Sequence, residues 1–237
     1  MKTVTHSILA LAGGIALLFS VGALAAEEAK EKGTNSDPEA KPPVTEAVTA
    51  IQNLALAGQL VTYGDQAKDP LALILAARIM KSTPTQAAEH PKEGETVPAD
   101  AKKEGGNKRD VSEILNRAKT LAAGRQDLLA MIADVDAITA KGRVGGPGAI
   151  RTAVAARGTD QFKIKFRGGQ QAIVVAEGDG DTDLDLFVYD ENGHLICQDI
   201  NYDDTVICGW TPRWTGNFTV RVVNRGRVYN RYTLVTN

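Results

Sequence analysis

The residues whose types and spacing could support chemistry are concentrated between Glu177 and Asp204. This stretch contains ten Asp or Glu residues and neither Lys nor Arg, whereas the stretch from Thr205 to the end contains five Arg and no acidic residue. Closely spaced carboxylates repel one another unless a cation or nearby arginines offset their charge. The pattern therefore indicates either a divalent-cation site or an acidic turn that pairs with arginine-bearing strands.

Calcium is the cation that such a turn favours, because it prefers hard oxygen ligands. The spacing resembles the first half of an EF-hand loop, but Leu184 stands where that loop requires Gly, and Asp190 stands in place of its final Glu. An EF-hand is therefore excluded. A different calcium site stays a hypothesis, built from the Gly178–Asp183 turn and from Asp199, Asp203 or Asp204 of the neighbouring loop. Its candidate ligands are Asp179, Asp181, Asp183 and Asp203. The alternative is a solvated turn whose Asp side chains accept hydrogen bonds from backbone N–H groups.

Aromatic and arginine side chains close to the C-terminus form a second candidate site. Such side chains favour contacts with sugars and peptides. The candidate binding residues are Trp210, Arg213, Trp214, Tyr229 and Arg231, together with Tyr232. Trp and Tyr in a small β-domain serve equally well in core or rim packing, so both interpretations stay open.

Catalysis has little support in the same region. From Ile150 onward the chain contains no serine, and its only histidine is His194. A Ser-His-Asp or Cys-His site cannot be assembled from these residues. Paired carboxylates for glycoside hydrolysis exist in number, but an acidic turn is a weak signal for them. We therefore expect a non-catalytic protein and keep a hydrolase as an alternative.

The first residues predict the compartment. Lys2 precedes an apolar run from Ile8 to Val21 and then an Ala-Leu-Ala triplet, which is the pattern of a signal peptide over residues 1–25. An uncleaved membrane anchor is the alternative. No later segment is apolar enough to span a membrane, so we expect a periplasmic or secreted protein without a transmembrane segment after signal cleavage.

Cysteine content and charge fit an exported protein. Cys197 and Cys208 are the only cysteines, and in an oxidising compartment a disulfide between them is the first expectation. A metal pair or a reactive thiol is the alternative. The chain has 237 residues, a net charge of −2 and a pI near 6.0, which gives it no general attraction to nucleic acid. The expected partner is an envelope protein or a polysaccharide.

Helical signals dominate the part of the chain that precedes this region. Residues 26–44 are charged, rich in Pro and almost free of large apolar groups, which predicts a disordered linker. Residues 45–143 predict a small helical bundle or two helical hairpins, interrupted by a polar, mobile insert at 84–109. The expected helices run from a cap at Thr45 to about Ala57, from Asp69-Pro70 to Lys81 with Leu71, Ile74, Leu75 and Ile79 at helical spacing, from Asp110 to Gly124, and from Gln126 to Lys141.

From about Ile150 the hydrophobic period changes to two, after a glycine-rich hinge at 143–148. Short alternating strands with turn signals between them predict an all-β sandwich over residues 150–237. Expected strands include Phe162–Phe166, Gln171–Ala176, Leu184–Tyr189, Leu195–Gln198, Phe218–Val223 and Tyr229–Val235. The fold class is therefore α + β in two parts, with helices first and an all-β part second.

The last third of the chain resembles a known family. The run DTDLDLFVYDENG at Asp181–Gly193, the segment WTPRWTG at Trp210–Gly216 and the ending at Phe218–Leu234 are similar to the bacterial pre-peptidase C-terminal (PPC) domain family. The resemblance covers Gly169–Asn237. It implies a jelly-roll-like β-sandwich that serves as a non-catalytic accessory module, and some relatives bind calcium or extracellular polymers.

Three functions are compatible with these observations. The first is an exported binding or interaction module, which the resemblance favours. The second is a hydrolase, or a hydrolase accessory subunit, with a site between the helical region and the sandwich. The third is a structural envelope protein that acts through its helices. The resemblance carries calcium over only as an implied property of the acidic turn, and no peptidase domain precedes the module here.

Overall fold

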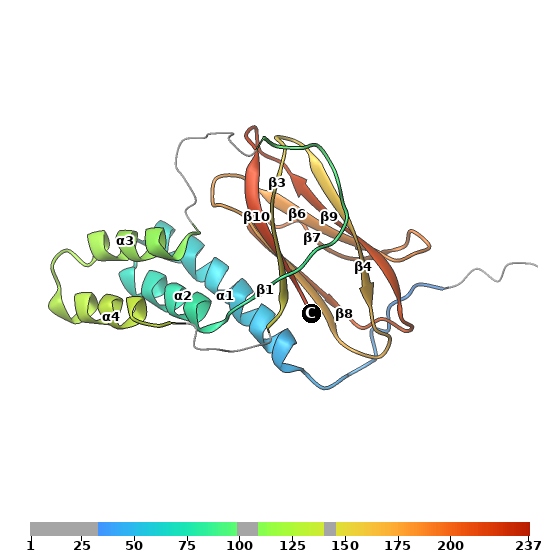
Figure 1. Cartoon of the computed structure of the whole chain (residues 1–237), viewed down its shortest axis with the longest axis horizontal. Helices are drawn as coiled ribbons and strands as arrows, with labels where there is room; N and C mark the ends of the chain where they lie inside the picture. Colours follow the sequence, from blue (N-terminus) through green and yellow to red (C-terminus); the bar gives the residue numbers. More distant parts are fainter. Residues whose placement is uncertain (1–32, 99–108, 140–145) are drawn as a thin grey trace, which may run out of the picture. The chain divides into compact units, whose positions relative to one another are not determined.

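The computed structural model describes residues 33–98, 109–139 and 146–237, all within one compact unit (Figure 1). These residues form four helices and ten mostly antiparallel strands. The expected signal peptide at 1–25 lies outside the described residues, as do 26–32 of the linker, 99–108 of the insert, 140–142 at the end of the expected fourth helix and 143–145 of the hinge. Within the described ranges no helix has the length and apolar character needed to cross a membrane.

The helices begin where the sequence predicts, because a polar side chain caps each of the first three. The Oγ1 atom of Thr45 accepts from the N–H of Val48 at 3.3 Å, and the Oδ1 atoms of Asp69 and Asp110 accept from N–H groups in their own first turns. The four helices are α1 (Glu46–Ala67), α2 (Pro70–Ser82), α3 (Val111–Leu121) and α4 (Gln126–Asp136).

Helix α1 is ten residues longer than predicted, and α4 ends five residues earlier. The two glycines inside α1 do not end the helix, and each lies where a neighbouring side chain leaves no room for a Cβ atom. A Cβ atom at Gly58 would lie 2.5 Å from Oγ1 of Thr205, and one at Gly64 would lie 2.8 Å from Cδ2 of Leu73. The helix ends only at Lys68, which adopts a left-handed conformation with φ of 56°.

The length of α1 lets it pack against both parts of the chain. Its first half packs Val48 and Ile51 against a strand face that includes Val175. Its second half packs Ala57 and Val61 against the other three helices. Figure 1 shows α1 running from the strands into the group of helices. The two parts are therefore joined by a shared helix and its core contacts.

Helix α2 buries only part of the apolar set predicted at helical spacing. Ile74 is 2% exposed, whereas Leu71 and Leu75 are each 48% exposed and lie outside the buried face. The buried face of α2 packs against α1 and the other helices and combines three alanines with Leu73 and Ile74. The buried residues are Ala72, Leu73, Ile74, Ala76 and Ala77.

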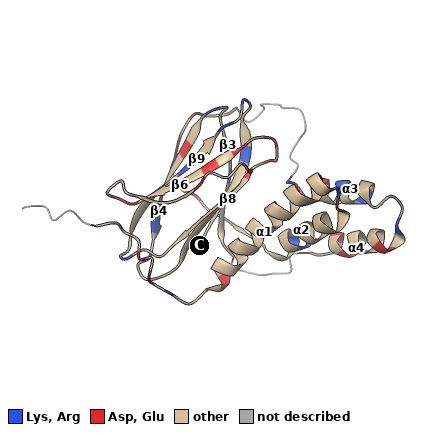
Figure 2. Ribbon diagram, turned by 180° about the vertical axis from the view of Figure 1, so that it is seen from behind, with Lys and Arg blue, Asp and Glu red and all other residues tan. Residues whose placement is uncertain are grey.

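The last two helices differ in charge. Figure 2 shows basic residues on α3 and acidic residues on α4.

The strands form two five-stranded sheets. Sheet A has the order β1-β3-β10-β5-β8, and sheet B has the order β2-β4-β9-β6-β7. Inward side chains of both sheets form one apolar core, in which Phe162, Leu186 and Val220 are fully buried. The bounds are Gln86–Ala87 (β1), Lys92–Glu93 (β2), Gly148–Val154 (β3), Thr159–Phe166 (β4), Ala172–Glu177 (β5), Leu184–Tyr189 (β6), Leu195–Asp199 (β7), Thr205–Trp210 (β8), Gly216–Asn224 (β9) and Asn230–Thr236 (β10).

Strands β1 and β2 come from the segment predicted as a mobile insert at 84–109. Strand β1 pairs with β3 in sheet A, and β2 pairs with β4 in sheet B, so residues 84–98 cover one edge of both sheets. The segment is held by a buried polar network as well. Lys92 donates to both carboxylate oxygens of Asp160, at 3.1 and 3.0 Å, and the hydroxyl of Tyr232 donates to Asp160 at 2.8 Å.

Part of the predicted disordered linker is also ordered. Within 26–44, Asn35 is completely buried at the end of sheet B, and the N–H of Asp37 donates to the carbonyl of Thr211 at 2.8 Å. Residues 33–37 are ordered despite their few apolar groups because hydrogen bonds, and not apolar burial, fix them to the loops at the end of sheet B.

Candidate functional site

The two acidic loops that the sequence predicts as neighbours do lie together. The loop between β5 and β6 contacts the loop between β7 and β8 through backbone hydrogen bonds. The N–H of Gly178 donates to the carbonyl of Asp204 at 2.8 Å, and the N–H of Leu184 donates to the carbonyl of Asp203 at 3.1 Å. Candidate ligands from both loops therefore belong to one acidic cluster.

Most carboxylates of this cluster accept hydrogen bonds from the protein. Asp179 is 1% exposed and accepts from the backbone N–H of Arg231 at 3.0 Å. Asp204 accepts from Nδ2 of Asn230 at 2.8 Å and from the backbone N–H of Gly180. Asp181 is exposed. These contacts match the sequence alternative of Asp side chains that cap backbone groups.

Calcium binding stays a prediction. Among the residues that the structure describes, no group of three or more His, Cys, Asp or Glu side chains is arranged so that it could hold a metal ion. Asp183 is the candidate ligand with the clearest capacity, because its Oδ1 atom is buried and has no hydrogen-bond partner within the described ranges. Burial and the neighbouring charge of Asp185 raise the pKa of Asp183.

Arg109 is a functional candidate that the sequence analysis missed. Its side chain is 6% exposed, lies 3.8 Å from Oδ1 of Asp203 and donates to Oγ1 of Thr62 in α1 at 2.9 Å. Burial raises the pKa values of Glu177 and Asp204 to about 7, and the positive charge of Arg109 opposes both shifts. Because Arg109 lies at the end of a polar segment without periodicity, no pattern in the sequence identifies it.

A cavity of about 770 Å³ opens beside Arg109, between the helices and the outer face of sheet A. Strand register places Arg151 of β3, Thr233 of β10 and Glu177 of β5 in one row across this face. Arg231 lines the same cavity. Glu177 is partly exposed as a residue, but its Oε1 atom is buried and has no hydrogen-bond partner among the described residues.

The aromatic and arginine residues predicted as one binding site divide into three places. Trp210 belongs to the core, where its ring centroid lies 4.8 Å from that of Phe166. Arg213 and Trp214 precede β9, whereas Tyr229 and Arg231 follow it. Strand β9 has nine residues, which corresponds to roughly 30 Å. The structure therefore does not bring these candidates together, although the guanidinium of Arg231 stacks on Tyr229 at 4.9 Å.

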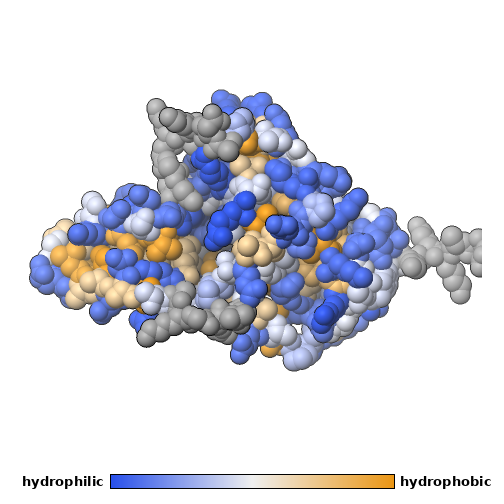
Figure 3. Space-filling model, in the orientation of Figure 1, coloured by the Kyte–Doolittle hydropathy of each residue, from blue (hydrophilic) through white to orange (hydrophobic). Residues whose placement is uncertain are grey.

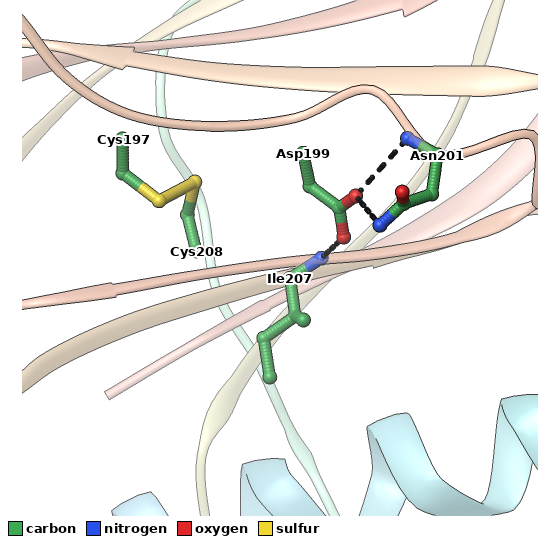
Figure 4. Close-up of a disulfide and its surroundings, with 5 residues drawn as sticks. All are labelled: Cys197, Asp199, Asn201, Ile207 and Cys208. Carbon is green, nitrogen blue, oxygen red and sulfur yellow. Dashed lines mark hydrogen bonds between the residues drawn. A yellow bond between two sulfur atoms is a disulfide. The ribbon is translucent and has the colours of Figure 1, made fainter.

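The disulfide between Cys197 and Cys208 is present and connects the two sheets (Figure 4). Cys197 lies on β7 at the edge of sheet B, and Cys208 lies on β8 at the edge of sheet A. Asp199 supports the same edge, because its side chain accepts from the N–H of Ile207 at 2.9 Å and from the N–H of Asn201 at 3.2 Å. The pair is thus structural and closes the edge opposite β1 and β2.

An apolar groove of about 270 Å³ lies between α2 and α4. Leu71, Leu75 and Met131 line it and are between 44% and 48% exposed. Figure 3 shows hydrophobic residues exposed over the helices. This groove is the feature that a partner of the helical region could contact.

Comparison with known proteins assigns no family to the chain. No family model matches the chain, and no curated protein matches its sequence.

Proposed function

We propose that this protein is an exported, non-catalytic binding module whose strand-rich part is a PPC-like jelly-roll sandwich and whose partner is an envelope protein or a polysaccharide. The cavity between the helices and sheet A is the observation that carries this proposal. Binding sites are concave, with apolar walls and a few charged groups that fix orientation. Leu54 and Met80 supply such a wall, while Arg151, Arg231 and Glu177 supply the charges.

Substitution of Arg151 tests this binding function. The full chain is expected to bind one member of a panel of soluble envelope polysaccharides and peptides, and Arg151→Ala is expected to weaken that binding at least about tenfold, because a hydrogen bond to a charged group contributes more than 1.4 kcal/mol. Biolayer interferometry gives both affinities. Lys165→Ala, on an exposed position of sheet B, serves as the control. Equal loss in both variants, or no binder in the panel, contradicts the proposal.

Glu177 supports the alternative of a hydrolase at the same cavity. A carboxyl group with a pKa of about 7 is suited to general acid or base catalysis near neutral pH. Hydrolysis of glycan or peptide substrates by the purified chain, abolished in Glu177→Gln, would favour the enzyme over the binding module. Turnover that persists in this variant would remove Glu177 from the mechanism.

The pKa of Glu177 predicts an unusual pH dependence of stability. Because the folded-state pKa of about 7 lies above the ordinary value of 4.5, the folded state holds a proton that the unfolded state has lost, and stability falls as pH rises through 7. Glu177→Gln removes the ionised form. We expect this variant to match the wild type at pH 5 and to exceed its unfolding free energy at pH 8 by about 1–3 kcal/mol. Urea titrations at the two pH values measure the difference.

Calcium can be tested at Asp183. If the acidic loops bind the ion, millimolar calcium raises the melting temperature of the full chain, since a ligand of the folded state stabilises it by mass action. Asp183→Asn keeps the shape of the side chain and removes its charge, so the calcium-dependent rise should disappear. An unchanged melting curve in the wild type with calcium and with chelator would leave the loops as backbone-capping turns.

The apolar groove between α2 and α4 favours the third function, a structural envelope protein that acts through its helices. Leu75→Lys would abolish capture of such a partner without changing the helical circular dichroism, because Leu75 is 48% exposed. A variant that still captures the same partner as the wild type excludes the groove.

A further inference from the structure

Residues 33–37 lie outside both sheets and cross the end of sheet B. They contact the turn between β6 and β7 and the loop between β8 and β9, which we call the receptor loops. Asn35 is completely buried there, although its neighbours in the segment are polar and partly or fully exposed. Complete burial of a polar side chain requires matched hydrogen bonds, because an unmatched amide is costly.

The side-chain amide and the backbone N–H of Asn35 all have hydrogen-bond partners in the receptor loops. Its Oδ1 accepts from the backbone N–H of Trp214 at 3.1 Å, and its Nδ2 donates to the backbone carbonyl of the same residue at 3.2 Å. Nδ2 also donates to Oε2 of Glu191 at 3.2 Å, and the backbone N–H donates to Oδ2 of Asp190 at 3.0 Å. This set accepts an amide and rejects an aspartate, whose second oxygen would face Glu191 and a carbonyl.

The receptor loops also hold the backbone on the C-terminal side of Asn35. Nε of Arg213 donates to the carbonyl of Ser36 at 2.8 Å, and the N–H of Asp37 donates to the carbonyl of Thr211 at 2.8 Å. Main-chain contacts combined with one selective side-chain pocket are the usual means of recognising an extended peptide.

The receptor groups are positioned by contacts that do not involve the segment. Oδ1 of Asp190 accepts from the N–H groups of Asn192 and His194, both at 2.9 Å, and the indole of Trp214 donates to Oε1 of Glu191 at 2.5 Å. The pocket also requires Gly216, since a Cβ atom there would lie 2.9 Å from Nδ2 of Asn35. The pocket is therefore preorganised, which reduces the entropic cost of binding.

We propose that Asp190, Glu191, Arg213 and Trp214 form a peptide-binding site selective for asparagine, with residues 33–37 as its ligand within the same chain. The partner that fits is an extended segment of another protein that presents Asn between small polar residues. This site is separate from the cavity beside Glu177, so it does not depend on the proposed function. The tethered segment competes with a partner at an effective concentration in the millimolar range.

The test uses the full chain with Asn35→Ala, which weakens the tethered ligand and leaves the receptor loops intact. Isothermal calorimetry measures binding of a synthetic peptide with the sequence of residues 31–40. We expect the variant to bind this peptide at least about tenfold more tightly than the wild type, whose site is already occupied. A peptide with Asp in place of Asn should show at least about tenfold weaker binding.

Two further variants keep the experiment decisive. Asn35→Asp offers a second route to a vacated site, should Asn35→Ala fold poorly, and it should bind the Asn peptide in the same way. Adding Gly216→Ala to either variant should abolish peptide binding, because the new methyl group would lie 2.9 Å from the position of the amide nitrogen and from Oε2 of Glu191, which is too close for both. Absence of binding by both folded single variants, or equal binding of the Asn and Asp peptides, would overturn the proposal.

Discussion

Replacing Lys92 with Met is expected to lower the free energy of unfolding by about 2–4 kcal/mol at pH 7, because it leaves the carboxylate of Asp160 buried without its ion-pair partner. The side chain of Asp160 is completely buried, whereas that of Lys92 is 24% exposed. Burial already raises the pKa of Asp160, and the hydrogen bonds from Tyr232 and Lys92 only partly offset it. Chemical denaturation measures the loss.

The pH dependence of this loss distinguishes the charge from simple packing. Without Lys92 the folded-state pKa of Asp160 rises further, so the stability of the variant should fall as pH rises through that value and recover at acidic pH. The double variant Lys92→Met with Asp160→Asn should recover most of the loss at pH 7, since no buried charge is left. Lys163→Met serves as the matched control, because Lys163 is 65% exposed, and a change larger than about 1 kcal/mol there would contradict the assignment.

The sequence predicts the parts of this fold that have strong local signals. Thr45, Asp69 and Asp110 cap helices, and the alternating residues of β4, β6 and β9 face the core. Strands β1 and β2 have two residues each and no alternation, so only their pairing with β3 and β4 makes them strands. Such pairing is a tertiary property that no local pattern reveals.

The candidate site likewise has features that local sequence patterns predict and features that only the folded structure reveals. Proximity of the two acidic loops follows from adjacent strands, and the sequence predicts it. The roles of individual side chains do not follow, because burial decides them. Trp210 lies in the core and Trp214 at a loop, although they are four residues apart. Glu177 and Arg109 acquire their significance only when α1 packs against sheet A, which periodicity cannot foresee.

Removing the disulfide is expected to cost about 2–4 kcal/mol of unfolding free energy in Cys197→Ser with Cys208→Ser. The bond joins edge strands of different sheets across a sequence separation of 11 residues. Cys208 is 1% exposed, so part of the loss comes from a hydroxyl placed in the core. Thermal unfolding of the oxidised wild type, the reduced wild type and the variant separates the two contributions, because the reduced wild type lacks the bond but keeps both sulfur atoms.

The disulfide should matter most for β7, since that strand has little else to hold it. It pairs only with β6 among the described strands, and none of its five residues is buried. Beyond the bond, the hydrogen bond from the N–H of Ile207 to Asp199 and the packing of the partly buried Ile196 against the core connect β7 to the rest of the fold. Hydrogen exchange in the double Ser variant should therefore accelerate at Leu195–Asp199 before it changes in β9, whose inward residues are fully buried. Uniform acceleration across both strands would mean that the bond stabilises the whole fold against unfolding and does not specifically retain its edge.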